Sequence, residues 1–269
     1  MSTLFHAMSD LWRWIPPLLY GWAAVAYGSR LPATRNPDTA SPWVGPFAVG
    51  GHFLQLLALS VAQQRFPFGT MWEALSVSTL VFSGAYLLLE RLARSTALGL
   101  PFFLLSVVGT GLAAAHNEPA RWPVWVQSTL FAAHVSLGVV GIGLLAASGL
   151  LAANWLLLYR LLRGRRFGAF AQTMPDLATL DRLFLASSSL GTVLLAIGAV
   201  LGLEWMRSYH IHLSAVFWKS ATVLLVLVWN AFIPVLRRRQ AWSSTWAAWM
   251  GFLSLVPLAL VVWAGTRAL

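Results

Sequence analysis

Long apolar runs separated by short polar links fill almost the whole chain. The runs cover residues 11–28, 46–62, 70–89, 97–115, 124–159, 183–203, 214–235 and 243–265. Most are close to the roughly 20 apolar residues that a helix needs to cross the hydrocarbon core of a bilayer. The pattern predicts an all-α fold, a polytopic transmembrane helix bundle with about eight spanning helices.

Two segments depart from this simple pattern. The run at 124–159 is too long for one crossing, and we expect it to project beyond the membrane toward Arg160. In the link at 167–182, Pro175 and Asp176 predict the start of a short interfacial helix, since proline suits a first turn and a carboxylate suits the positive helix end. That helix would place Leu177, Leu180 and Phe184 on one face and lead into the sixth span.

The composition supports lipid as the solvent. The chain is 58% hydrophobic and only 10% charged, whereas a soluble domain carries about 25% charged residues. A soluble fold of this length could not bury so much apolar surface. Cysteine is absent from the sequence, which excludes disulfides, thiol redox chemistry and cysteine-ligated metals. The first partner that the sequence predicts is therefore the lipid bilayer.

The net charge of +10 comes from 18 lysine and arginine residues against 8 acidic ones. These cations lie between the apolar runs, so the positive-inside rule accounts for them and no nucleic-acid partner is expected. The first, third, fifth and seventh links hold 12 of the 18 cations. We therefore predict a multi-pass protein of the bacterial inner (plasma) membrane, with both termini outside.

Histidines inside or beside the spans are the first candidates for chemistry. A titratable side chain in hydrocarbon is costly and is a functional candidate for that reason. His52 lies within the second span, and His134 begins the transmembrane part of the fifth helix. Each is either a haem or metal ligand or a histidine hydrogen-bonded to a neighbouring helix.

Other candidates lie near helix ends. His210 and His212 follow the sixth span two residues apart, and His116 ends the fourth span. These three are either metal ligands or solvated polar residues. Glu73 lies just inside the third span, where a carboxylate either faces the bundle, pairs with a base or caps the helix.

Several catalytic signatures are missing from the sequence. There is no nucleophile elbow, no HExxH zinc motif and no P-loop. Ion-coupled carriers usually need several buried carboxylates, and only Glu73 lies well inside a span. We therefore expect a protein that is not an enzyme.

Three stretches resemble the cytochrome c assembly protein family, the CcsA/CcmC/HemX group. They are Phe66–Leu75, which contains the glutamate at the start of a span, His134–Gly138, and Met174–Leu183, which leads into glycines at 191 and 202. The resemblance covers residues 46–265, and 1–45 would be a first transmembrane helix with a cytoplasmic link. It implies haem binding at the outer face, with His134 as an axial ligand to the iron. His52 occupies a place similar to an intramembrane histidine of some members.

The chain departs from the family at its tryptophan-rich outer motif. In residues 203–219 only scattered aromatics such as Trp205 remain, with Lys219, and residues 243–265 contain no histidine. The chain is therefore most similar to the HemX/YpjD branch. His210, His212 or His116 would then supply the second ligand.

The resemblance leads to three hypotheses. The first is a haem-handling membrane protein that takes part in c-type cytochrome biogenesis, with haem and other maturation proteins as partners. The second is a membrane scaffold of the same fold that has lost haem binding. The third is a transporter that moves haem across the bilayer with His52 as an inner station.

Overall fold

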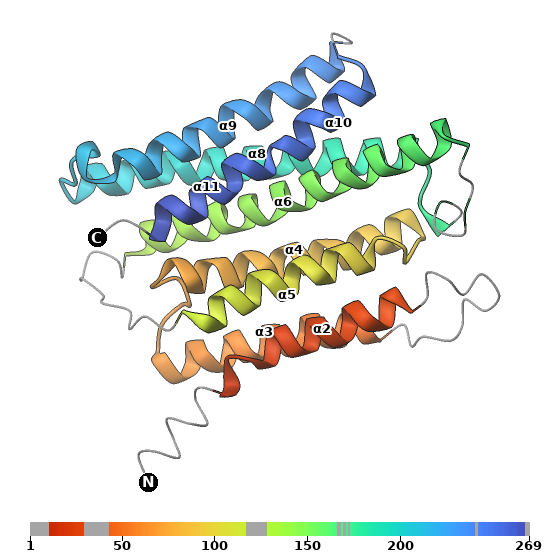
Figure 1. Cartoon of the computed structure of the whole chain (residues 1–269). Coiled ribbons are helices and arrows are strands. Elements are labelled where there is room, and N and C mark those ends of the chain that lie inside the picture. The colour runs from red at the N-terminus through yellow and green to blue at the C-terminus, as the bar shows by residue number, and fades with distance from the viewer. Residues whose placement is uncertain are drawn as a thin grey trace. The chain divides into compact units, whose positions relative to one another are not determined.

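The structure, a computed structural model, describes residues 11–29, 43–116, 128–165, 168, 171, 173–239 and 242–266. Within these ranges the regular elements are helices and no strand occurs (Figure 1). In chain order they are α2 (Ile15–Gly28), α3 (Val44–Gln63), α4 (Met71–Ala93), α5 (Gly99–Ala115), α6 (Thr129–Arg163), α8 (Leu177–Ser208), the 3-10 helix η3 (Leu213–Val216), α9 (Phe217–Arg238), α10 (Ser244–Leu253) and α11 (Leu255–Thr266).

Each predicted apolar run coincides with a helix, the last run with α10 and α11 together. Six segments of the described chain are long and apolar enough to cross a membrane: α3, α4, α6, α8, α9 and the stretch Ser244–Ala264. The helices α2 and α5 have 14 and 17 residues and are shorter. The all-α fold with several segments suited to a membrane is confirmed in this coarse form, and the number of about eight spans stays a prediction.

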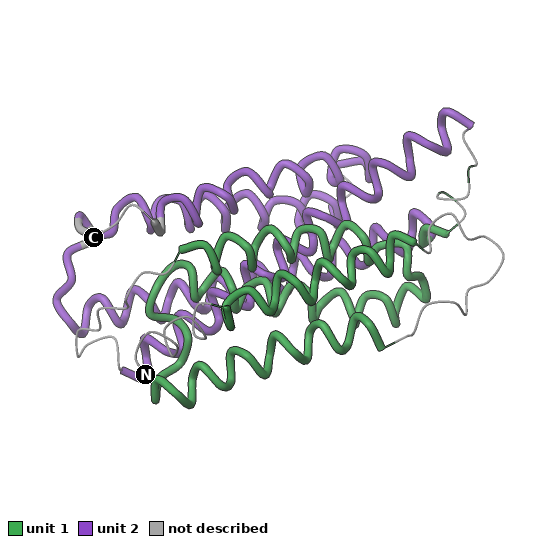
Figure 2. Tube along the Cα trace, turned by 60° about the horizontal axis from the view of Figure 1, so that its bottom comes forward, with its two compact units in different colours: residues 1–119, 166–175 green, residues 120–165, 176–269 purple. Residues whose placement is uncertain are grey.

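The chain divides into two compact units, which are coloured separately in Figure 2. Unit 1 comprises residues 1–119 and 166–175, and unit 2 comprises residues 120–165 and 176–269. In unit 1, α2 packs against α3 and α5, and α4 also packs against α3 and α5. In unit 2, α6 packs against α8 and α10, and α9 packs against α8, α10 and α11. Each unit thus arranges its described helices in a ring, with α10 and α11 together as one member in unit 2, and neighbours along the chain are neighbours in space.

Side-chain caps define where several helices begin. The Thr70 hydroxyl accepts a hydrogen bond from the backbone N–H of Glu73, and Ser128 and Ser243 cap α6 and α10 in the same way. Asp176 caps α8 by accepting from the Thr179 N–H at 2.7 Å. Hydrogen bonds from the backbone N–H and hydroxyl of Thr179 hold the pKa of the Asp176 carboxyl below its ordinary value of 3.8. Such caps satisfy N–H groups that have no partner within the helix.

The predicted short interfacial helix at 175–182 is wrong. Asp176 does begin a helix, but α8 continues without a break for 32 residues to Ser208. No proline occurs between Asp176 and Ser208, so the backbone hydrogen bonding continues. Leu180 and Phe184 are fully buried, which shows that this first part of α8 packs inside unit 2.

The helices α6 and α8 approach each other closely along a line of glycines. A Cβ added to Gly141 would lie 2.8 Å from the backbone nitrogen of Leu195 and 2.9 Å from the carbonyl oxygen of Gly191. A Cβ added to Gly198 would lie 3.0 Å from the backbone nitrogen of Gly138. These distances leave no room for a side chain, so the glycines allow backbone to pack on backbone.

The long helix α6 extends past its apolar part, as predicted. Its 35 residues span about 52 Å, which exceeds the roughly 30 Å of a hydrocarbon core. Near its end the Arg160 guanidinium lies 5.1 Å from the centre of the Trp249 ring. This cation–π contact ties the end of α6 to α10.

Candidate functional site

His134 lies near the start of α6 and points at α8. Its Nδ1 atom lies 2.7 Å from the backbone carbonyl oxygen of Gly198. A carbonyl oxygen only accepts, so Nδ1 carries the proton and donates. The neutral ring then presents Nε2 as a lone-pair nitrogen, and none of the described residues hydrogen-bonds it. A histidine oriented by a carbonyl in this way is the usual form of a metal-ligating imidazole.

Gly202, one turn beyond Gly198 on α8, provides the space for this imidazole. A Cβ added to Gly202 would lie 2.5 Å from the Cε1 atom and 2.6 Å from the Nδ1 atom of His134. The ring therefore occupies the place that any larger residue at 202 would need. The structure places Gly202 against the predicted ligand residue itself.

Aromatic rings lie beside His134. The Phe131 ring centre lies 6.3 Å from that of His134 and 4.9 Å from that of Trp205. The Trp205 ring is in turn 6.1 Å from that of Tyr209. Trp205 stands on the last turns of α8 and is 8% exposed. Trp205, an aromatic residue of the outer motif, therefore lies on a helix and packs within unit 2.

His210 and His212 lie just beyond the end of α8. His210 has a positive φ of 52°, and both histidines are exposed. Neither imidazole is hydrogen-bonded by any residue that the structure describes. Because His134 contacts Gly198 and Gly202 near the same end of α8, all three imidazoles lie at one end of unit 2.

His52 is a fully buried histidine of unit 1 with both ring nitrogens engaged. Its Nδ1 lies 2.9 Å from the Tyr20 hydroxyl and its Nε2 lies 3.0 Å from the Ser76 hydroxyl. A ligand to iron needs one nitrogen with a free lone pair. The geometry thus favours the alternative stated for His52, a histidine hydrogen-bonded to neighbouring helices. The geometry gives no support to a haem-binding site at His52.

His116 and Glu73 also belong to unit 1, whereas His134 belongs to unit 2. His116 stacks on Trp72 with ring centres 3.7 Å apart and an angle of 11° between the planes, and its Nδ1 lies 2.9 Å from the Leu112 carbonyl oxygen. Glu73 forms a two-fold ion pair with Arg65 at 2.6 and 2.7 Å. Glu73 Oε2 also accepts a hydrogen bond from the backbone N–H of Gly69 at 2.7 Å, so two of the alternatives for Glu73, pairing with a base and capping the helix, are both found.

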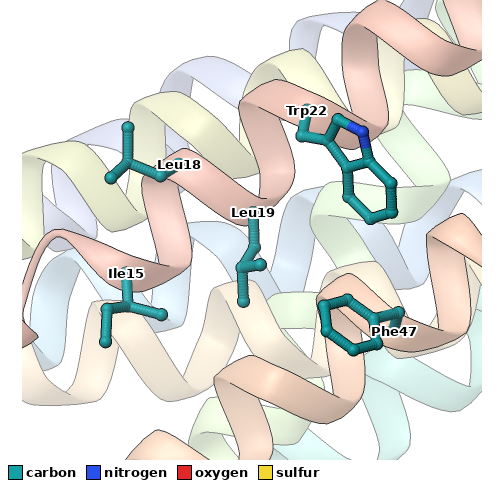
Figure 3. Close-up of a pocket in the computed structure, with 5 residues that line it drawn as sticks. All are labelled: Ile15, Leu18, Leu19, Trp22 and Phe47. Carbon is teal, nitrogen blue, oxygen red and sulfur yellow. The ribbon is translucent and has the colours of Figure 1, made fainter.

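No group of three or more metal-binding side chains occurs among the residues that the structure describes. A surface pocket between α2 and α3 is shown in Figure 3 and is lined by Ile15, Leu18, Leu19, Trp22 and Phe47. These side chains carry no titratable group and no ligand for iron. An apolar hollow of this kind suits a lipid acyl chain and offers nothing to the chemistry discussed above.

Comparison with known proteins gives a distant similarity. No family model matches the chain. The chain is 22% identical over 195 residues to Protein HemX of Bacillus subtilis (strain 168). This match covers 69% of this chain and 68% of that protein. The chain is 25% identical over 151 residues to Protein HemX of Brevibacillus brevis, and this match covers 54% of each chain. The similarity supports a HemX-like family.

The similarity and the structure agree on the general class of protein. The chain is similar to two HemX proteins at low identity, and it is a helical protein with several segments suited to a membrane. The chain spans about half the length of the Brevibacillus brevis relative. The ligand and the activity of this chain are therefore treated as proposals.

Proposed function

We propose that this chain is a haem-binding membrane protein that takes part in the assembly of c-type cytochromes. The observation that carries the proposal is the imidazole of His134, held by the Gly198 carbonyl and leaving Nε2 for a metal. Resemblance to the haem-handling assembly family and similarity to HemX proteins support it.

The donor chemistry at this end of unit 2 suits haem iron. Neutral imidazole is a common axial ligand, and two axial ligands complete the coordination of a haem iron. His134 would be the first, and His210 or His212, whose rings are exposed and not hydrogen-bonded by described residues, would be the second. When bound, the iron would contribute the redox and ligation chemistry of the cofactor.

The surrounding residues would serve binding rather than reaction. Phe131 and Trp205 would pack against an apolar macrocycle and keep water from it, since aromatic rings make large apolar contacts. Gly202 would keep the His134 ring in place. With no cysteine in the chain, the protein would hold and present haem without forming a covalent bond, so we propose a handling role rather than an enzymatic one.

The experiment is a haem titration of the purified protein in detergent. Haemin added to wild-type protein should produce a shifted Soret band that saturates at one haem per chain. His134→Ala should weaken binding by about tenfold or more, because loss of a metal ligand or its support typically costs 10–100-fold. Ser148→Ala is the matched control, since it removes a buried hydroxyl of unit 2 that donates to the Phe184 carbonyl and is no candidate ligand. A saturation curve for His134→Ala identical to that of wild type would end the proposal.

A second candidate function is a membrane scaffold of the same fold without haem. The observation that favours it is the burial of Trp205 against Phe131, which uses an aromatic of the outer motif for packing. Under this alternative, folded wild-type protein gives no Soret shift at any haemin concentration and co-purifies with another membrane protein.

A further inference from the structure

Four polar side chains are buried deep in the core of unit 2, and each of its four helical members contributes one. All four are at most 1% exposed, and they are Ser148 of α6, Ser188 of α8, Asn230 of α9 and Ser254 between α10 and α11. We call this set the polar layer. Burying a polar group is costly unless it is hydrogen-bonded, so each member of the layer needs a partner.

Two members of the polar layer are satisfied by backbone carbonyls. The Ser148 hydroxyl donates to the Phe184 carbonyl oxygen at 3.1 Å, and the Ser254 hydroxyl donates to the Gly251 carbonyl oxygen at 2.6 Å. A Cβ added to Gly149, the residue after Ser148, would lie 3.2 Å from the same Gly251 oxygen. These two serines therefore lie at one level of unit 2, and Phe184 stands one turn before the member on α8.

The packing of α8 against α9 places the other two members opposite each other. Residues seven positions apart lie two turns apart on one face of a helix. Each member is the middle of such a series, which runs Asp181, Ser188 and Leu195 on α8 and Arg237, Asn230 and Val223 on α9. Asp181 is paired with Arg237 at 3.2 Å, and Leu195 and Val223 pack in one apolar cluster. Because both outer pairs are neighbours, the middle pair faces across the two helices between them.

Ser188 and Asn230 are the members whose hydrogen bonding is incomplete. Ser188 Oγ and Asn230 Oδ1 make no hydrogen bond to any residue that the structure describes. The Asn230 amide nitrogen donates to the Val226 carbonyl at 3.0 Å, which leaves Oδ1 as an acceptor without a donor. A serine inside a helix commonly donates to the carbonyl four residues earlier, and for Ser188 that carbonyl belongs to Phe184 and already accepts from Ser148. The two atoms therefore need a polar group that lies between them.

A water molecule has the chemistry that these two atoms require. It can donate and accept at once, and a buried water typically makes about three hydrogen bonds to polar groups that have no other partner. A metal cation fits less well, because the polar layer contains no carboxylate and an unpaired charge in the interior is costly. The nearest carboxylate on α8, that of Asp181, lies two turns away and is already paired with Arg237.

We propose that the polar layer of unit 2 holds an ordered water molecule that bridges Ser188 and Asn230. The water donates one hydrogen bond to Asn230 Oδ1 and makes a second with the Ser188 hydroxyl, which joins α9 to α8 within the apolar interior. Along α6 the layer lies 14 residues from His134, or roughly 21 Å. The water site therefore goes beyond the proposed haem binding and does not depend on it.

The test is hydroxyl-radical labelling of the purified full-length protein in detergent by a short X-ray pulse. The radicals form from water, so a side chain that bulk solvent does not reach is oxidised only if a bound water lies beside it. Phe184 is fully buried and stands one turn from Ser188, and mass spectrometry of its peptide should show oxidation in wild type. Asn230→Leu replaces the unpaired acceptor with an apolar side chain of similar size. It should reduce the oxidation of Phe184 to the level of an unirradiated sample.

Ser106→Ala is the matched control, because it removes a fully buried hydroxyl of unit 1. Its oxidation of Phe184 should equal that of wild type. Ser188→Ala is the second test variant and keeps the proposal testable if Asn230→Leu does not fold. Size-exclusion profiles and unfolding temperatures establish which variants are folded.

The alternative occupant, a metal cation, is tested by unfolding temperatures in sodium chloride and in choline chloride at equal ionic strength. The two temperatures should be equal, and a rise specific to sodium overturns the proposal by assigning the site to a cation. Absence of Phe184 oxidation in wild type overturns it too. So does oxidation at the wild-type level in a folded Asn230→Leu or Ser188→Ala variant. None of these measurements uses haem, so their failure is distinct from failure of the haem titration.

Discussion

Replacing Gly202 with alanine tests whether the His134 ring is held as the structure shows. The added Cβ would lie 2.5 Å from His134 Cε1 and 2.6 Å from Nδ1, well inside van der Waals contact. Either the ring moves away or the helices α6 and α8 separate. Ring movement breaks the hydrogen bond to the Gly198 carbonyl, which is worth about 1 kcal/mol, whereas helix separation is a case of overpacking that costs about 1–3 kcal/mol.

The expected loss of stability therefore lies between these two limits, at about 1–3 kcal/mol. For a chain of this size that corresponds to a drop in unfolding temperature of roughly 2–4 °C per kcal/mol. Thermal unfolding in detergent, followed by intrinsic tryptophan fluorescence, measures it. If haem is bound as proposed, displacement of the ring also weakens the Soret titration by about tenfold, since about 1.4 kcal/mol corresponds to a factor of ten.

Gly138→Ala is the matched control for this experiment. Gly138 lies one turn from His134 on α6, and nothing lies within 4 Å of a Cβ added there. In a helix interior an alanine without clashes is neutral or stabilising. An unfolding temperature for Gly202→Ala equal to that of wild type, or an equal drop for Gly138→Ala, would refute the close approach of Gly202 to the imidazole.

Three further predictions concern other parts of the chain. Glu73→Gln should destabilise the protein by about 1–3 kcal/mol in thermal unfolding, because it breaks a half-buried two-fold ion pair with Arg65; no change would mean that the pair is solvated. Gly99→Ala should lower the unfolding temperature, because an added Cβ would overlap the Tyr27 ring; an unaltered unfolding temperature would contradict that packing. Asp176 should stabilise the fold above its unfolded pKa and lose this effect as the pH falls through its lowered folded pKa. Wild type should thus lose its advantage over Asp176→Ala on acidification below about pH 4, and a constant difference down to pH 2 would argue against the cap.

The sequence predicted the helices well because long apolar runs leave the backbone no alternative in lipid. It also predicted that Asp176 begins a helix, since the N-cap signal is local. The same local reading failed on the length of that helix. Pro175 suggested a separate interfacial segment, but burial of Phe184 in unit 2 shows that the first turns of α8 belong to the bundle.

The candidate site was predictable in position and not in contacts. A histidine at the start of a span marked His134 as a candidate, but its partner Gly198 lies 64 residues away in the sequence. For His52 both a ligand and a hydrogen-bonded histidine were compatible with the sequence, and the choice depended on Tyr20, 32 residues away. Such contacts depend on which helices are neighbours, and hydropathy carries no information about that.

The division of the chain has a consequence for biosynthesis. Residues 166–175 belong to unit 1, yet they follow α6, which belongs to unit 2. Within that segment the Thr173 carbonyl accepts a hydrogen bond from the Ser95 hydroxyl at 2.7 Å. The first unit therefore cannot be completed until the ribosome has already made α6, the first helix of the second unit.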